Sequence, residues 1–200
     1  MLKGAPVALS KTQKLPTKAP QMSKDIVSYL QSSVKTGLGS TDFEVPVQRK
    51  ISAENQILFD QWLNAMSERL MAKIVNTDAR LDLLKTVWYE SRRAGLDPGM
   101  VLGLIEVESN FNVQNEQTGR VGLLGVERKW PTLIGDGDVK RLTIIRPNLR
   151  YGCSILSAYI EMNDGDLFLA LSQYDRSYGR LKFPNKVLTA WRMYQYKGAT

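Results

Sequence analysis

The sequence predicts a mainly α domain, and three observations support that prediction. Apolar residues recur at helical spacing in several stretches between residues 23 and 194. Short apolar runs without that period are confined to residues 112–147, where glycine, threonine and proline favour turns and a small irregular β element. The chain has 200 residues, 43% of them hydrophobic, which is enough for one globular domain with a core plus an extension.

Residues 1–50 are interpreted as an N-terminal extension, and residues 51–200 as the main domain. Residues 1–22 alternate Lys, Pro, Thr and Ala without periodicity, so we expect a disordered leader. From Ser23 to Val34 the apolar residues have helical spacing, and this short helix is expected to dock on the domain's own core rather than on a partner. Two glycines predict a loop over residues 36–40.

Two amphipathic helices are expected next, at residues 52–70 and 77–94. Ser52 is a plausible helix start, and the first helix has an apolar stripe of Ile57, Leu58, Trp62, Met66 and Leu70. One side of the second helix carries Leu81, Leu84, Val87, Trp88 and Ser91. Glu90 lies in a charged last turn beside Arg92 and Arg93. We therefore expect Glu90 to be solvated.

A further helix is predicted to begin at Pro98, because Asp97 is a good N-cap and proline suits the first helical position. Val101, Leu104, Ile105 and Glu108 fall at i, i+3, i+4 and i+7, so Glu108 continues the apolar stripe, whereas Glu106 should face solvent. A carboxyl group against apolar surface has a raised pKa and can donate a proton near neutral pH. The alternative is that the helix end frays and Glu108 bends into water.

Helices are expected again from Asn148, from Asp166 to Tyr174 and from Phe183. Their apolar positions are Leu149, Cys153, Leu156 and Ile160 in the first, and Val187, Leu188, Trp191 and Tyr194 in the last. Cys153 is the single cysteine and lies within such a stripe, so it is interpreted as a small core residue.

Composition excludes several kinds of active site. The chain has no histidine and one cysteine, which excludes a Ser-His-Asp triad, a Cys-His dyad and a His or Cys zinc site. Acid–base chemistry would fall to carboxylates. The net charge of +7 favours a polyanionic partner, either nucleic acid or an anionic cell-wall polymer. No secretory signal or membrane span is visible, and no nucleic-acid-binding motif accompanies the charge.

Several segments match one known family in the same order. They are Gly95-Leu-Asp-Pro98, Glu108-Ser-Asn-Phe-Asn112, Gly119-Arg-Val-Gly-Leu-Leu-Gly-Val126, Asn148-Leu-Arg-Tyr-Gly152, Ala170-Leu-Ser-Gln-Tyr-Asp175, Tyr178-Gly179 and Pro184-Asn185. Together they resemble the catalytic domain of the soluble lytic transglycosylases, a family with a goose-type lysozyme-like fold. The resemblance spans about residues 80 to 195.

The resemblance implies a peptidoglycan-cleaving enzyme. Such enzymes use one Glu as acid and then base, and the C6 hydroxyl of N-acetylmuramic acid attacks in place of water to leave a 1,6-anhydromuramoyl end. Glu108 matches that Glu. The resemblance also implies that the substrate-binding residues are Ser109, Gly122, Leu123, Leu124, Tyr174 and Asp175. It implies no metal or cofactor, no nucleic acid, a monomer in the periplasm or cell envelope, and peptidoglycan strands as the partner.

The chain departs from the family pattern at polar cleft positions. Leu124 replaces a Met and Gly125 replaces a Gln, which removes an amide, while Glu116-Gln117 occupy the region of an expected Ser. Asp175 replaces an Asn and would place a second carboxylate near Glu108, where it would raise the pKa of one of the two. Asn148 and Gly152 match the family's Asn-x-x-x-Gly pattern, interpreted first as helix capping and close packing.

Three alternatives stay open at this stage. The altered cleft could belong to a catalytically impaired glycan-binding or scaffold protein. Asp175 could supply a base for water, which would make the chain a muramidase- or chitinase-type hydrolase on the same fold. A nucleic-acid binder rests on charge alone.

Overall fold

The computed structural model describes residues 24–38, 53–178 and 180–196, and over these ranges the protein is mainly α, as predicted. The long helices are α1 (Lys24–Leu38), α2 (Ala53–Leu70), α3 (Thr77–Arg93), α4 (Pro98–Ser109), α6 (Ile145–Met162), α7 (Leu167–Tyr174) and α8 (Lys182–Tyr194). No helix in the described ranges has the length and apolar character needed to cross a membrane.

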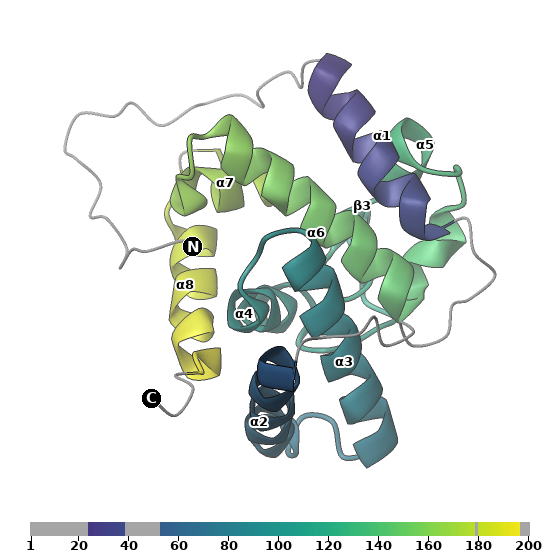
Figure 1. The fold of residues 1–200 in the computed structure, drawn as a ribbon. Helices are drawn as coiled ribbons and strands as arrows, with labels where there is room; N and C mark the ends of the chain where they lie inside the picture. The colour runs from purple at the N-terminus through teal and green to yellow at the C-terminus, as the bar shows by residue number, and fades with distance from the viewer. Residues whose placement is uncertain (1–23, 39–52, 179, 197–200) are drawn as a thin grey trace.

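Helix α4 lies near the centre of the molecule, with α8 on one side and α3 on the other (Figure 1). It begins as predicted: the Asp97 side chain accepts a hydrogen bond from the Met100 N–H at 2.8 Å, and Pro98 opens the helix. Asp97 also accepts a hydrogen bond from the Trp191 indole N–H at 2.8 Å, which joins the start of α4 to α8. Gly103 permits the close approach, because a Cβ there would lie 2.7 Å from the Trp191 backbone nitrogen.

The stretch between α4 and α6 contains the small β element expected for residues 112–147. Three two-residue strands, β1 (Glu116–Gln117), β2 (Arg120–Val121) and β3 (Val126–Glu127), form an antiparallel sheet in the order β1-β2-β3. The short helix α5 (Trp130–Ile134) and a 3-10 turn (Val139–Thr143) lead into α6. This irregular stretch lies over the C-terminal end of α4.

Helix α1 packs on α5 and α6 (Figure 1), so the prediction that it docks on the protein's own core is confirmed. Leu30 and Val34 are completely buried there. The helix continues to Leu38, so the loop predicted from residue 36 is wrong for its first three positions. The predicted disordered leader (1–22) and the proposed helix start at Ser52 lie outside the described residues.

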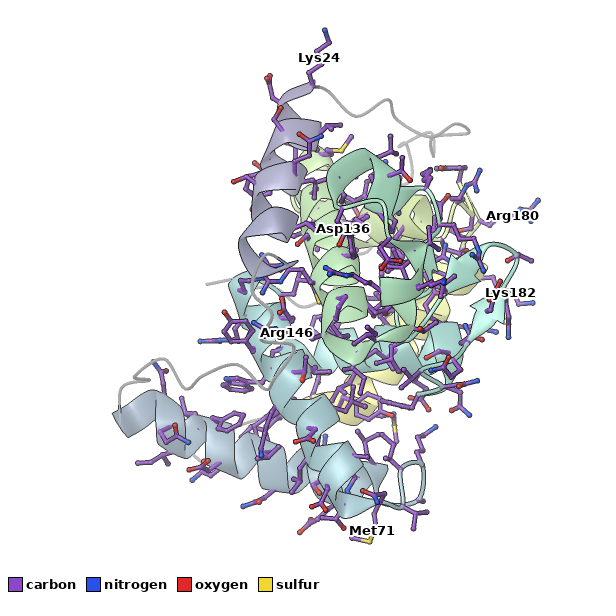
Figure 2. All side chains as sticks on the ribbon, turned by 90° about the vertical axis from the view of Figure 1, so that its right-hand side faces the viewer. Lys24, Met71, Asp136, Arg146, Arg180 and Lys182 are labelled. Carbon is purple, nitrogen blue, oxygen red and sulfur yellow. The ribbon has the colours of Figure 1, made fainter. Side chains whose placement is uncertain are left out.

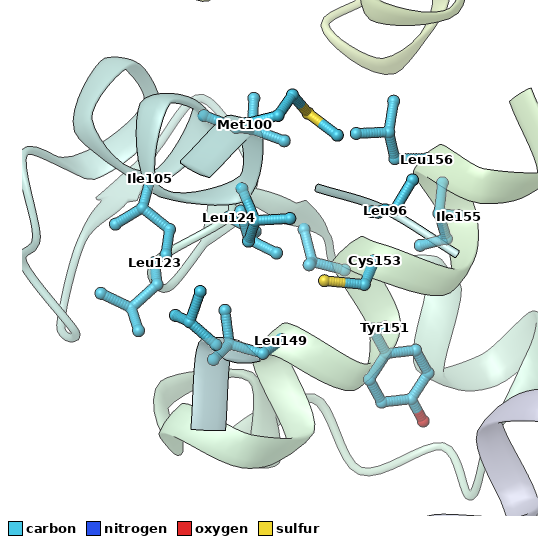
Figure 3. Close-up of a cluster of buried hydrophobic side chains, with 14 of the residues drawn as sticks. Leu96, Met100, Ile105, Leu123, Leu124, Leu149, Tyr151, Cys153, Ile155 and Leu156 are labelled. Carbon is cyan, nitrogen blue, oxygen red and sulfur yellow. The ribbon is translucent and has the colours of Figure 1, made fainter. Parts of the chain in front are cut away.

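Buried hydrophobic residues from Leu30 to Tyr194 form one continuous core. Leu123 and Leu124 from the loop between β2 and β3 pack among Ile105 of α4 and Leu149 of α6 (Figure 3). Cys153 is buried in the same cluster, as predicted for a small core residue. The irregular loop is therefore fixed to both helices by its own apolar side chains.

The predicted stripe of α2 is wrong at its first two positions. Ile57 and Leu58 are 58% and 41% exposed, whereas Trp62, Met66 and Leu70 are buried. Figure 2 shows the first turns of α2 extending away from the rest of the structure. Helical spacing defines a face, but only the C-terminal half of this face meets α3, where the Trp62 and Trp88 rings lie 5.0 Å apart.

The prediction that Glu90 is solvated is wrong. Its side chain is fully buried, and its carboxylate pairs with Arg93 at 2.9 Å and with Arg150 of α6 at 2.7 Å, with Arg146 3.7 Å away. Arg93 also donates hydrogen bonds to Ser33 of α1 and Ser154 of α6. The charge can be buried because guanidinium groups from two helices surround it.

Candidate active site

Helix α4 ends abruptly just after Glu108, and the local sequence explains why. The Ser109 hydroxyl donates to the Ile105 carbonyl at 3.0 Å, and Asn110 adopts a left-handed conformation (φ 48°) that ends the helix. Phe111 also has a positive φ of 65°, and its buried ring lies 6.2 Å from Tyr194. The Asn115 side-chain amide donates to the Glu108 carbonyl. The helix end is therefore held in place, and Glu108 does not fray into water.

The Glu108 carboxyl group is nearly enclosed, with its side chain only 7% exposed. Burial raises its pKa to about 8; the Arg120 guanidinium, which is ion-paired with it, lowers the pKa, and the Asp175 carboxylate raises it. Burial outweighs the Arg120 charge, so Glu108 can carry a proton at neutral pH. Glu106, two residues earlier, pairs with Lys73 at 2.7 Å on another side of the helix. The two acids therefore have different surroundings, as expected.

Arg120 of β2 is a central residue of the site that the sequence analysis did not single out. Besides Glu108, it contacts the Tyr174 carbonyl, to which Nη1 donates at 2.9 Å, and its guanidinium lies 5.3 Å from the centre of the Tyr174 ring. The Asp175 carboxylate is 3.9 Å from the same Nη1. Arg120 thus joins the end of α4 to the end of α7. The only sequence signal was a charged residue inside a glycine-bounded loop already assigned to the cleft.

An open groove with a volume of about 340 Å³ lies over these residues. Its floor contains Glu108, Arg120 and Asp175. The remaining lining residues are Val107, Asn115, Gln117, Thr118, Ser177, Arg180, Lys182, Phe183 and Lys186. Most of the residues that line the groove are polar or charged, with one aromatic ring and several cations, and the nearly buried Glu108 is among them.

Of the predicted site residues, Glu108 and Asp175 are brought together in this groove. The other predicted site residues are buried and do not line the groove. These are Ser109, Gly122, Leu123, Leu124 and Tyr174. Tyr174 instead donates its hydroxyl hydrogen to the Leu124 carbonyl at 2.7 Å, and its backbone holds Arg120. Its role is to position the loop that carries Arg120.

Asn148 and Gly152 of α6 hold that same loop from behind. The Asn148 side-chain amide donates to the Val121 and Leu142 carbonyls, and its oxygen accepts from the Leu124 N–H. Asn148 is therefore a loop staple rather than a helix cap, which corrects the first interpretation. Gly152 allows the close packing that was predicted, since a Cβ there would lie 2.7 Å from the Leu124 Cβ.

Gly125 has a structural reason to lack a side chain. Its φ is +53°, and a Cβ would collide with Oε2 of Glu108 and lie 3.1 Å from Nε of Arg120. The space of an expected glutamine is thus taken by the Glu108–Arg120 pair. Near the position of the expected Ser, Gln117 and Thr118 line the groove.

Chemically, the site presents the Glu108 carboxyl group, a guanidinium that stabilises its conjugate base, and a second carboxyl group on Asp175. Within the described ranges, no cluster of three or more Asp, Glu, Cys or His side chains is placed to hold a metal ion. No protein-family model matches the chain, and no curated protein sequence matches it.

Proposed function

We propose that this protein has a goose-type lysozyme-like fold and is a lytic transglycosylase that cleaves the bond between N-acetylmuramic acid and N-acetylglucosamine in peptidoglycan. One observation carries the proposal: Glu108 lies at the end of a buried helix and lines an open groove, and its pKa is raised to about 8. A carboxyl group that is protonated at neutral pH is what departure of a sugar oxygen requires. The ordered motifs of the sequence analysis give the substrate class.

In the proposed reaction Glu108 acts twice. It first donates its proton to the glycosidic oxygen as the C1–O bond breaks, and the N-acetylglucosamine unit leaves as an alcohol. The resulting carboxylate then accepts the proton of the muramoyl C6 hydroxyl as O6 bonds to C1, which gives the 1,6-anhydro ring. Arg120, already paired with Glu108, would stabilise the carboxylate between the two steps. No second carboxylate is needed.

A hydrolytic outcome is the second candidate, and Asp175 is the observation that favours it. Asp175 lines the same groove as Glu108, and burial raises the pKa of its carboxyl group. A carboxylate in this position could accept a proton from water, as the second acid of most glycosidases does. The product would then carry a reducing end in place of an anhydro end.

The test is incubation of the protein and its Glu108→Gln variant with purified peptidoglycan, followed by mass analysis of the released fragments. We expect anhydromuropeptides from the parent and a loss of at least about 100-fold in the variant, because the amide cannot donate the proton. Glu106→Gln is the matched control on the same helix. Activity should fall as pH rises through about 8, where Glu108 loses its proton.

The other outcomes separate the alternatives. Reducing ends that disappear in Asp175→Asn would assign hydrolysis to the second carboxylate. Binding to peptidoglycan without any release of fragments would refute the enzymatic proposal and assign the groove to a glycan-binding protein.

A further inference from the structure

One wall of the groove carries three cations, Arg180, Lys182 and Lys186, referred to below as the cationic wall. All three side chains are exposed, and none forms an ion pair with another residue in the described part of the chain. Figure 2 shows Arg180 and Lys182 pointing outward on the same side of the molecule. The positive charge of this wall is therefore available to a ligand in the groove.

The cationic wall is not explained by helix stability. Lys182 is the first residue of α8, whose first turn has no acidic residue, and the helix dipole disfavours cations at that end. Lys186 lies four residues later on the same face, where two like charges repel each other. Local rules broken without a compensating partner are typical of a functional surface.

The acids of the groove do not neutralise the cationic wall. Glu108 is ion-paired with Arg120, and Asp175 lies 3.9 Å from the same guanidinium. Glu127 of β3 is paired with Arg176 and Lys129 and does not line the groove. The remaining lining residues, such as Gln117 and Thr118, are uncharged. The groove therefore has an excess of positive charge on one side.

We infer that the cationic wall binds carboxylates carried by the glycan strand, so that the groove selects an anionic strand over a neutral one such as chitin. This inference rests on the proposed function, which supplies the glycan. The carboxylates can come from the lactyl group of the sugar or from the peptide attached to it. Phe183, between Lys182 and Lys186 in sequence, gives the apolar face of a sugar ring a surface beside these charges.

The test compares two forms of one ligand, a soluble peptidoglycan strand with its carboxylates intact and the same strand with them converted to amides. Binding is measured in a Glu108→Gln background, so that no turnover occurs. We expect the native strand to bind about tenfold more tightly at low salt, and the preference to shrink as salt is raised. Lys182→Gln combined with Lys186→Gln should lower the preference by about three- to tenfold.

The matched control is Arg192→Gln combined with Lys140→Gln, which removes the same charge from exposed positions outside the groove. This pair should leave the preference unchanged. A peptide-free strand, which keeps only its lactyl carboxylates, identifies which carboxylates are bound. If this strand still binds more tightly than its amidated form, the cationic wall binds the lactyl groups. If that preference is lost, the wall binds the peptide carboxylates.

Equal binding of native and amidated strands would overturn the inference while leaving the proposed function intact. Failure of both strands to bind would instead refute the proposed function. A single-stranded DNA of similar length that bound as tightly as the native strand, with the same sensitivity to the Lys182 and Lys186 changes, would also overturn the inference, because the wall would then attract any polyanion.

Discussion

At the scale of single residues, Glu108 links catalysis to stability. The unfolded chain releases this proton near pH 4.5 and the folded protein near pH 8, so between these values the folded state holds more protons and loses stability as pH rises. Glu108→Gln cannot titrate. The stability of the variant relative to the parent should therefore increase by up to about 1.4 kcal/mol per pH unit across this interval and level off above it.

Denaturant unfolding of both proteins from pH 5 to pH 9 measures this effect. The free energy of unfolding of the variant differs from that of the parent at every pH because Arg120 loses its partner. Only the change of this difference with pH reports on the titration of Glu108. Glu106→Gln removes a carboxyl group from the same helix outside the groove. A trend of equal size in that control would attribute the effect to overall charge, and a flat difference for Glu108→Gln would show that its pKa is not raised.

Gly125→Ala tests whether cleavage requires the observed position of the Glu108 carboxyl group, and Gly119→Ala is the matched control for backbone strain. Both glycines have positive φ, +53° and +79°, so alanine should cost about 1–2 kcal/mol of folding stability at either position. Only at Gly125 would the new Cβ also displace the Glu108 carboxyl group, since Gly119 has open space around it.

We therefore expect Gly125→Ala to abolish cleavage of peptidoglycan and Gly119→Ala to retain it, as measured by product release after unfolding curves have shown comparable stability losses. Equal activity of the two variants would mean that the position of Glu108 beside Gly125 is not required for the reaction.

The position of Glu108 could be predicted from the sequence, whereas the contacts of Arg120 and Glu90 could not. The position of Glu108 followed from helical spacing, because a period of 3.6 residues is a local property. Arg120 and the surroundings of Glu90 did not follow, because their partners lie far along the chain: Tyr174 is 54 residues from Arg120, and Arg150 is 60 residues from Glu90. No local pattern reports such a contact.

At the scale of helices and strands, the boundaries with clear capping chemistry were predicted best. Asp97 and Asp166 accept hydrogen bonds from the N–H groups three residues later, and α4 and α7 begin directly after them. Burial was predicted less well. Ile57 and Leu58 have the spacing of a core face, but among the residues that the structure describes no element covers that part of α2. Coverage depends on tertiary arrangement rather than on period.

The buried ion-pair cluster of Glu90, Arg93 and Arg150 joins α3 to α6, and its contribution to folding stability can be measured. Glu90→Met would leave Arg150, which is buried, without its carboxylate and should destabilise the fold by about 3–5 kcal/mol. Adding Arg150→Met should recover part of that loss, because the uncompensated charge is then also removed. Thermal and denaturant unfolding of the single and double variants measures both effects.

An exposed pair is the control for this cluster. Glu116 and Arg128 form an ion pair with both side chains about half exposed, so Glu116→Met should cost at most about 1 kcal/mol. A Glu90→Met variant as stable as Glu116→Met would show that the buried cluster is not needed to hold α3 on α6.

At the scale of the whole molecule, the contacts of α1 lead to a prediction about cooperative unfolding. The extension assigned to residues 1–50 contains α1, yet α1 packs on α5 and α6, and Ser33 receives a hydrogen bond from Arg93 of α3. These contacts join it to the same core that supports the groove. We expect α1 to unfold together with residues 53–196 as one cooperative unit.

Leu30→Ala tests this expectation. The Leu30 side chain of α1 is fully buried, so its truncation should lower the free energy of unfolding by about 2–5 kcal/mol. If α1 belongs to the cooperative unit, the variant lowers the midpoint of a single transition seen both by helical signal and by tryptophan fluorescence. Tyr29→Ala, on the same helix but 53% exposed, should change stability by no more than about 0.5 kcal/mol. If Leu30→Ala instead left the main transition in place and increased only the hydrogen exchange of α1, the helix would open independently of the rest of the protein.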